Sequence, residues 1–194
     1  AGCDEIINQL EWSEKVAATV KHRGDSFEFF CACNAADRMD INISAPLLEA
    51  VRTEPLKYYA HMPKLMQNPD MAMQIIDLCE AVLPLDDMAE GMGDYLFADK
   101  LNKEHQCLDY VLPELARYPL RGVRLIKTGL NSRVVRGRNM ACRALSGWVK
   151  SEGKPLSDIS FELYTEIARI HKAEVNEQTK ETMQKLLDGE AGDE

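Results

Sequence analysis

The sequence lacks the features that would place the chain in a membrane or in an oxidising compartment. No apolar run approaches the roughly 18 residues needed to cross a bilayer, and no basic region followed by an apolar core opens the chain. Three of the six cysteines fall inside apolar, helical patterns, where buried and reduced thiols are expected rather than disulfides. We therefore expect a cytoplasmic protein that makes no contact with a membrane.

Motifs for catalysis and for metal binding are also missing. The four histidines are scattered, and none lies in a His-x-x-x-His or Glu-x-x-His frame that would direct two ligands to one side of a helix. Cys31 and Cys33 have the wrong separation for paired zinc ligands, and there is no phosphate-binding glycine loop or nucleophile elbow. We expect no cofactor, no metal and no enzymatic activity, and an enzyme with an unrecognised site is the least supported alternative.

Alternation of apolar and polar residues with period two, which is typical of half-buried strands, is almost absent. Apolar residues recur instead three and four positions apart, which predicts helices. Asn68 and Pro69 form a capping residue followed by a proline at the first helical position. Asn176 caps a last helix that ends near Gly189, and Ser157 opens the helix before it. The pattern predicts an all-α protein.

A short motif recurs at long range. The pattern P-x-L-x-x-x-P begins at Pro63 and again at Pro113, fifty residues later, and a third copy without prolines begins at Thr165. Self-similarity at such a period is typical of a solenoid, in which each helical unit stacks on the next to bury its apolar face. We therefore expect Pro63, Pro113 and Thr165 at equivalent places in three successive and roughly parallel helices, the prolines having a structural role.

Two segments resemble HEAT repeats. Residues 112–115 look like the first helix of a HEAT unit, which a proline often kinks. Residues 137–145 resemble the second-helix pattern, with an arginine three residues before a small residue and a final Ala-Leu, although glycine replaces the usual valine. The resemblance covers about 60–190. It implies a right-handed α-solenoid whose concave face binds macromolecules, and armadillo-like or irregular helical arrays would leave similar traces.

The length of 194 residues allows one domain with a sizeable core. We accordingly expect a single all-α domain over 1–194. Within it, HEAT-like repeats are expected at 61–190, and 1–60 holds N-terminal helices whose repeat character the pattern does not define.

Charge is distributed unevenly along the chain. The whole sequence has 32 acidic and 23 basic residues, yet the stretch 115–151 contains nine basic residues and no carboxylate. Solubility is served by mixing the two signs over the surface. The segregation therefore indicates a surface for an anionic partner, or for the acidic part of the same chain.

A helical wheel at about 100° per residue separates two kinds of basic residue in 133–150. An apolar stripe runs along one face and consists of Val134, Ala141, Leu145, Trp148 and Val149. Arg138 lies inside this stripe, so Arg138 and Trp148 are predicted to be structural. A buried arginine needs a carboxylate because an unpaired buried charge destabilises the fold. Asp109 and Glu114, on the preceding helix, are the expected partners.

Seven of the other basic residues form a predicted basic patch, made up of Arg121, Arg124, Lys127, Arg133, Arg136, Arg143 and Lys150. We predict that this patch binds an acidic protein or peptide segment, which would make the chain a non-catalytic scaffold or adaptor. Nucleic acid is the alternative ligand, because neutralising phosphates releases counterions, although the net charge of −9 opposes it. A third reading is a solvated face that meets acidic helices of the same chain.

Overall fold

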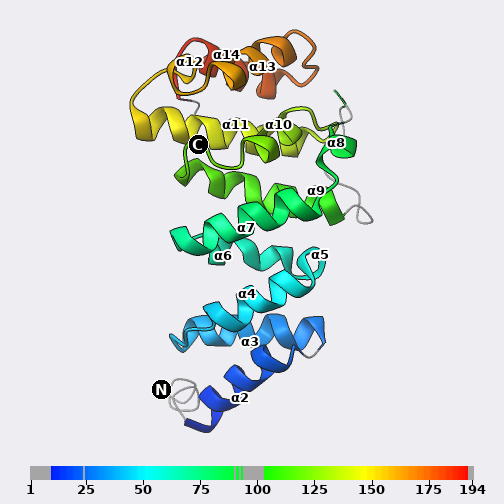
Figure 1. The fold of residues 1–194 in the computed structure, drawn as a ribbon, viewed down its shortest axis with the longest axis vertical. Coiled ribbons are helices and arrows are strands. Elements are labelled where there is room, and N and C mark those ends of the chain that lie inside the picture. Colours follow the sequence, from blue (N-terminus) through cyan, green and yellow to red (C-terminus); the bar gives the residue numbers. More distant parts are fainter. Residues whose placement is uncertain (1–9, 24, 90, 92, 94–102, 192–194) are drawn as a thin grey trace. The chain divides into compact units, whose positions relative to one another are not determined.

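The computed structural model describes residues 10–23, 25–89, 91, 93 and 103–191, and their regular elements are all helices (Figure 1). The prediction of an all-α protein is confirmed. None of the helices in these ranges combines the length and the apolar character needed to span a bilayer. The chain divides into two compact units, Ala1–His61 and Met62–Glu194. This division falls where the sequence separates the N-terminal helices from the HEAT-like segment, and the single-domain organisation stays a prediction.

The first unit is built from short helices. They are α2 (Leu10–His22), α3 (Ser26–Arg38), α4 (Ser44–Thr53), α5 (Pro55–Tyr58) and the 3-10 helix η1 (Tyr59–His61). Asp25 caps α3, since its Oδ1 accepts hydrogen bonds from the N–H groups of Phe27 and Glu28 at 2.8 and 2.9 Å. The buried Phe29 ring lies 4.6 Å from the Tyr58 ring and 5.3 Å from the His61 ring, between centroids. This aromatic cluster joins α3 to the end of the unit.

The helices of the second unit range from four to 18 residues in length. They are α6 (Met62–Leu65), α7 (Pro69–Val82), α8 (Leu85–Met88), α9 (Lys103–Val111), the 3-10 helix η2 (Leu112–Arg117), α10 (Val123–Leu130), α11 (Val135–Glu152), α12 (Leu156–Ile159), α13 (Phe161–His171) and α14 (Glu177–Leu187). Asn68 caps α7 and Asn176 caps α14 with their side-chain oxygens, as predicted. The predicted start at Ser157 is wrong: α12 ends at Ile159, and the extended backbone of Ser160 separates it from α13.

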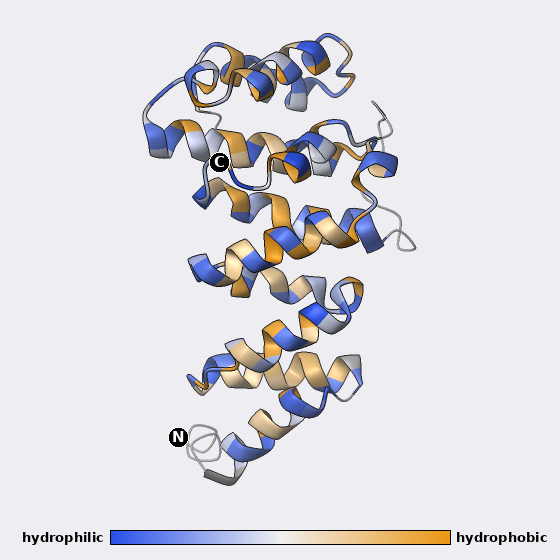
Figure 2. Cartoon of the chain, viewed as in Figure 1, coloured by the Kyte–Doolittle hydropathy of each residue, from blue (hydrophilic) through white to orange (hydrophobic). Residues whose placement is uncertain are grey.

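With α8, η2 and α12 set aside, the successive helices of the second unit alternate between two layers. The first layer contains α7, α10 and α13, with α10 in contact with both of its neighbours. The second layer contains α6, α9, η2, α11 and α14, in which α9 contacts α6 and α11, and α11 contacts η2 and α14. Contacts between α6 and α7, α10 and α11, and α13 and α14 join the layers. Figure 2 shows the hydrophilic and hydrophobic stripes that such one-sided burial requires.

The three copies of the repeat motif do not occupy equivalent places. Pro63 lies in the four-residue α6 and Pro113 near the start of the 3-10 helix η2, both in the second layer. Thr165 lies inside α13, in the first layer, so the predicted equivalence of the third copy is wrong. The third match was carried by apolar spacing alone, which any amphipathic helix shares.

The contact between α11 and η2 is close because small residues line it. Trp148 is fully buried, as predicted, and its Nε1 donates a hydrogen bond to the Leu115 carbonyl at 2.7 Å. One residue earlier, a Cβ added to Gly147 would lie only 2.5 Å from the Ala116 Cβ. The two backbones therefore approach to a distance that only glycine permits at this position.

Arg138 is fully buried, as its place in the apolar stripe predicted, but its predicted partners are wrong. Its Nε and Nη2 donate to the two carboxylate oxygens of Glu174 at 2.6 and 2.7 Å, and Nη1 donates to the Ser132 carbonyl at 2.8 Å. Asp109 pairs instead with Arg136, and Glu114 with Arg117. The periodicity of α11 places Arg138 on a buried face but cannot identify which neighbouring segment covers that face.

The cysteines of the described ranges are free thiols. Cys33, Cys79, Cys107 and Cys142 are buried, as predicted, whereas Cys31 is exposed on α3. Cys3 lies outside the described residues.

Candidate functional site

Three members of the predicted basic patch share one exposed face of α11. Arg136, Arg143 and Lys150 follow one another at intervals of seven residues, and each is exposed. Seven helical residues rise about 10 Å, so the outer two side chains start about 20 Å apart along the helix axis. We call these three residues the basic ridge. Its straight course follows from the near coincidence of seven residues with two helical turns.

The members of the basic ridge differ in their carboxylate contacts. The Arg136 Nε lies 3.5 Å from the Asp109 Oδ2 of α9, which is a long ion pair. Arg143 has no ion pair or hydrogen bond with any other residue that the structure describes. Burial raises the pKa of the Asp109 carboxyl to about 6, and the nearby Arg136 opposes this shift. Arg143 is therefore the member with the most freedom to bind a ligand.

Two further members of the predicted patch are paired with acidic residues of the same unit. Arg124 Nη2 lies 3.9 Å from the Asp86 Oδ1 of α8, and Lys127 forms an ion pair with Glu162 of α13. Arg121 is exposed in the turn before α10, and Arg133 is exposed just before α11. The interpretation as a solvated face meeting acidic helices thus describes Arg124 and Lys127 well.

The structure does not bring the residues of α10 and α11 together on one surface. Gly129 marks the side of α10 that faces α11, because a Cβ added there would lie 3.1 Å from the Ala141 Cβ. At 100° per residue, Arg124 and Lys127 lie about 140–160° around α10 from Gly129. The basic ridge lies about 140–180° around α11 from Ala141. The two groups therefore point away from each other, on opposite sides of the helix pair.

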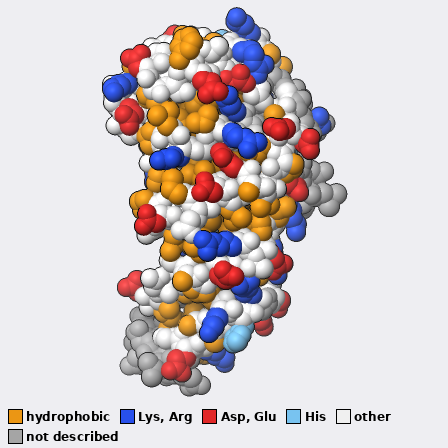
Figure 3. Space-filling view, in the orientation of Figure 1, with side chains coloured by type: hydrophobic (Ala, Val, Ile, Leu, Met, Phe, Trp, Pro, Cys, Tyr) orange, Lys and Arg blue, Asp and Glu red, His pale blue; other side chains and the backbone are white. Residues whose placement is uncertain are grey.

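The surface as a whole shows little segregation by sign where Figure 3 displays it. Lys and Arg side chains on that face are interspersed with Asp and Glu side chains, and apolar side chains lie between them. A run of basic residues in the sequence need not produce a basic area, because helices from other parts of the chain bring their carboxylates alongside. The candidate surface is accordingly reduced from the seven predicted residues to the basic ridge and its immediate surroundings.

A serine, a histidine and an aspartate meet near the start of α11, where sequence reasoning identified no site. The Nδ1 of the buried His105 lies 3.4 Å from the Ser132 Oγ, and Asp109 follows one turn later on α9. Ser132 is fully buried, and its Oγ accepts a hydrogen bond from the Val134 N–H at 3.1 Å. A substrate cannot reach this hydroxyl in the observed conformation. The group therefore orients the first turn of α11 rather than forming a nucleophilic site.

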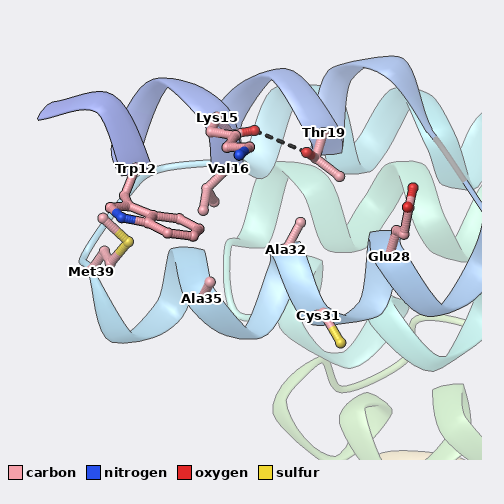
Figure 4. Close-up of a pocket in the computed structure, with 9 residues that line it drawn as sticks. All are labelled: Trp12, Lys15, Val16, Thr19, Glu28, Cys31, Ala32, Ala35 and Met39. Carbon is pink, nitrogen blue, oxygen red and sulfur yellow. Dashed lines mark hydrogen bonds between the residues drawn. The ribbon is translucent and has the colours of Figure 1, made fainter. Parts of the chain in front are cut away.

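An apolar groove lies within the first unit, between α2 and α3, and the sequence analysis missed it as well. Its volume is about 510 Å³, within the range of small-molecule sites. Figure 4 shows Trp12 beside Met39 at one end and Thr19 and Glu28 toward the other. Trp12 is 44% exposed, and the Lys15 ammonium lies 5.2 Å from its ring centroid, which is a cation–π contact. The signal in the sequence was a tryptophan directly flanked by polar residues, Glu11 before it and Ser13 to Lys15 after it.

In the described ranges, no cluster of three or more His, Cys, Asp and Glu side chains could hold a metal ion. No protein-family model, curated protein or solved structure matches the chain.

Proposed function

We propose that the chain is a non-catalytic binding module, a scaffold or adaptor, that binds an acidic protein or peptide segment along the basic ridge of α11. The observation that supports this proposal best is Arg143. It is exposed, has no carboxylate partner among the described residues, and lies between two further basic residues on one helical face. An arginine in this position offers a bidentate contact to a carboxylate without losing an existing ion pair.

The spacing of the basic ridge defines the partner that fits. Its charges recur about every 10 Å, which is close to one turn of a polyproline II helix, with three residues per turn and a rise of about 3.1 Å per residue. A segment in this conformation with a carboxylate at every third position would thus present all of its carboxylates on one side, toward the three members. Arg136 is already close to Asp109 at 3.5 Å, so Arg143 would contribute most of the attraction.

We further propose that the second unit is a right-handed, HEAT-like solenoid. The alternation of consecutive helices between two layers supports this, as does the position of Pro63 and Pro113 in the same layer. In such an array each layer presents a continuous outer surface formed by equivalent faces of successive helices. The basic ridge lies on the outer face of the second layer, where a linear partner would contact several helices in turn.

The experiment compares two charge reversals. Arg143→Glu/Lys150→Glu changes the basic ridge, and Arg121→Glu/Arg124→Glu makes the same change in charge on and before α10. The probe is a fluorescently labelled peptide with glutamate at every third position, followed by anisotropy, with thermal melts to verify folding. We expect the wild type and the α10 variant to bind the peptide and the α11 variant to lose binding by at least about tenfold, which is about 1.4 kcal/mol.

Single-stranded DNA and RNA of matched charge serve as competing probes. Preferential binding of either nucleic acid, lost in the α11 variant, would assign the basic ridge to nucleic acid and overturn the acidic-peptide proposal. Equal binding of the peptide by both charge-reversal variants would show that the basic ridge does not recognise it. The salt dependence of nucleic-acid binding would measure the number of contacts. If about three phosphates are neutralised, the logarithm of the association constant should fall with the logarithm of the salt concentration with a slope near −3 at most.

A further inference from the structure

Three sulfur atoms from three different helices meet in the core of the second unit. The Met62 Sδ of α6 lies 3.8 Å from the Cys79 Sγ of α7 and 3.8 Å from the Cys107 Sγ of α9. All three side chains are buried, and both cysteines are free thiols. Residues separated by up to 45 positions in sequence thus place their most polarisable atoms at one point.

The two thiols also interact with each other. A hydrogen bond with Cys107 and burial raise the pKa of the Cys79 thiol well above its usual range. Each sulfur of the group therefore lies near both of the others, and the three form a triangle. Three sulfur donors at about 2.3 Å from a central metal ion would lie about 4 Å apart, which is close to the two observed separations of 3.8 Å.

We propose that Met62, Cys79 and Cys107 form a binding site for a single cuprous ion. Thiolate and thioether donors together select Cu(I) among the biological metals. Zinc, in contrast, takes four nitrogen, oxygen or thiolate sulfur donors in its structural sites. The helices α6, α7 and α9 already hold the donors at the separation that three-coordinate copper requires, so binding needs little rearrangement of the fold.

The binding step is a ligand exchange without oxidation or reduction. Each of the two thiols loses a proton and forms one copper–sulfur bond, while the thioether donates a lone pair, so one Cu(I) enters and two protons leave. The product carries one negative charge inside an apolar core, which opposes binding. The copper–thiolate bonds must outweigh this cost and that of deprotonating two thiols, so copper affinity rises with pH.

This inference is independent of the basic ridge. The sulfur triangle joins α6 and α9 of the second layer to α7 of the first. Bound copper would therefore cross-link the two layers at the start of the second unit. The expected role is stabilisation of that part of the fold, or storage of the ion, and neither requires an exposed coordination position.

The experiment uses the full, reduced chain under anaerobic conditions, titrated with Cu(I) against a chromogenic cuprous chelator. The wild type should retain one equivalent of copper that the chelator does not remove, and X-ray absorption should show three sulfur neighbours. Affinity should rise by up to about 100-fold per pH unit, as expected for two released protons. Met62→Leu, Cys79→Ser and Cys107→Ser should each lose the chelator-resistant equivalent.

Two controls separate the triangle from other thiols. Cys142→Ser removes a buried thiol on α11, and Cys31→Ser removes the exposed one on α3, and both should keep the equivalent. Retention by Cys79→Ser at unchanged affinity would overturn the proposal. So would a folded wild type that yields all of its copper to the chelator. X-ray absorption on the wild type tests the proposal even if a variant of Met62, Cys79 or Cys107 fails to fold. A copper ion with fewer than three sulfur neighbours would contradict the proposed three-sulfur site.

Discussion

Arg138 and Glu174 form a fully buried, two-pronged ion pair between α11 and the loop that precedes α14. The same carboxylate also accepts hydrogen bonds from the N–H groups of Val175 and Asn176 at 3.0 and 2.9 Å. One acidic side chain thus neutralises the guanidinium and orders the loop. Both groups are fully desolvated, so the pair must be complete for the surrounding core to be stable.

Removal of one partner of this pair should destabilise the fold strongly. Arg138→Ala leaves Glu174 buried without its counter-charge and removes the packed arginine stem. We therefore expect the free energy of unfolding to decrease by about 3–5 kcal/mol. Arg143→Ala, on the exposed face of the same helix, should change stability by less than about 0.5 kcal/mol. Urea denaturation of both variants measures the difference. Similar midpoints for the two would contradict the assignment of Arg138 to the core.

Gly147→Ala should destabilise the chain in spite of the higher helix propensity of alanine. The new Cβ would lie 2.5 Å from the Ala116 Cβ and 3.0 Å from its Cα, so α11 and η2 must separate. Overpacking of this kind costs about 1–3 kcal/mol, against a propensity gain of at most about 1 kcal/mol. A lowered thermal midpoint is the expected result. The double variant Ala116→Gly/Gly147→Ala should recover part of the loss, and a midpoint above the wild type for Gly147→Ala alone would refute the close approach.

Trp148→Phe tests the hydrogen bond between the two elements. Phenylalanine cannot donate to the Leu115 carbonyl, which now receives the indole N–H at 2.7 Å. The carbonyl keeps a hydrogen bond from the Tyr118 N–H at 2.9 Å, so the variant loses one of two bonds, at about 0.5–1.5 kcal/mol, and leaves a small cavity as well. Trp12→Phe is the matched control in the first unit, where the indole is 44% exposed. Denaturant midpoints should fall for Trp148→Phe and stay near the wild type for the control; the opposite order would contradict the burial assignments.

The carboxyl of Asp109 gives stability a specific pH dependence. Its pKa is raised from 3.8 to about 6 because burial disfavours the charged form, with Arg136 acting in the opposite direction. Between these two values the folded state holds a proton that the unfolded state has released. The contribution of Asp109 to the free energy of unfolding therefore decreases as pH rises from about 4 to about 6 and is constant above, a total of at most about 3 kcal/mol.

Asp109→Asn removes this titration and keeps the shape of the side chain. The difference in unfolding free energy between wild type and variant, measured from pH 4 to pH 7, isolates the contribution of the one carboxyl. The wild type should lose stability relative to the variant as pH rises through this window. A constant difference would show that Asp109 titrates alike in the folded and unfolded states.

The sequence was sufficient for features that depend on one helix alone. The wheel for 133–150 placed Trp148 and Arg138 on buried faces and Arg143 on an exposed one, because helical periodicity determines which side chains point the same way. The caps at Asn68 and Asn176 were found for a similar reason: a capping residue bonds only to its own first turn.

Features that depend on two helices were not found in this way. Glu174 is 36 positions from Arg138, and nothing in the spacing of either residue indicates the other. The division of the predicted basic patch into two groups also depends on two helices. In α10 and in α11, the face that packs against the other helix is the one opposite the basic residues. The apolar groove and the sulfur triangle likewise arise where separate helices meet. Sequence patterns describe the faces of single helices, which is why the basic ridge of α11 could be found from them and the sites between helices could not.

The Arg138–Glu174 pair also determines an order of events during synthesis. A chain that has emerged from the ribosome only as far as α13 holds an arginine in the apolar stripe of α11 and lacks the carboxylate that neutralises it. Such a chain must keep the guanidinium in water, and so cannot close the core around Trp148. The second unit therefore completes its folding only after Glu174 has been translated, and a product truncated before that residue would expose apolar surface to chaperones and proteases.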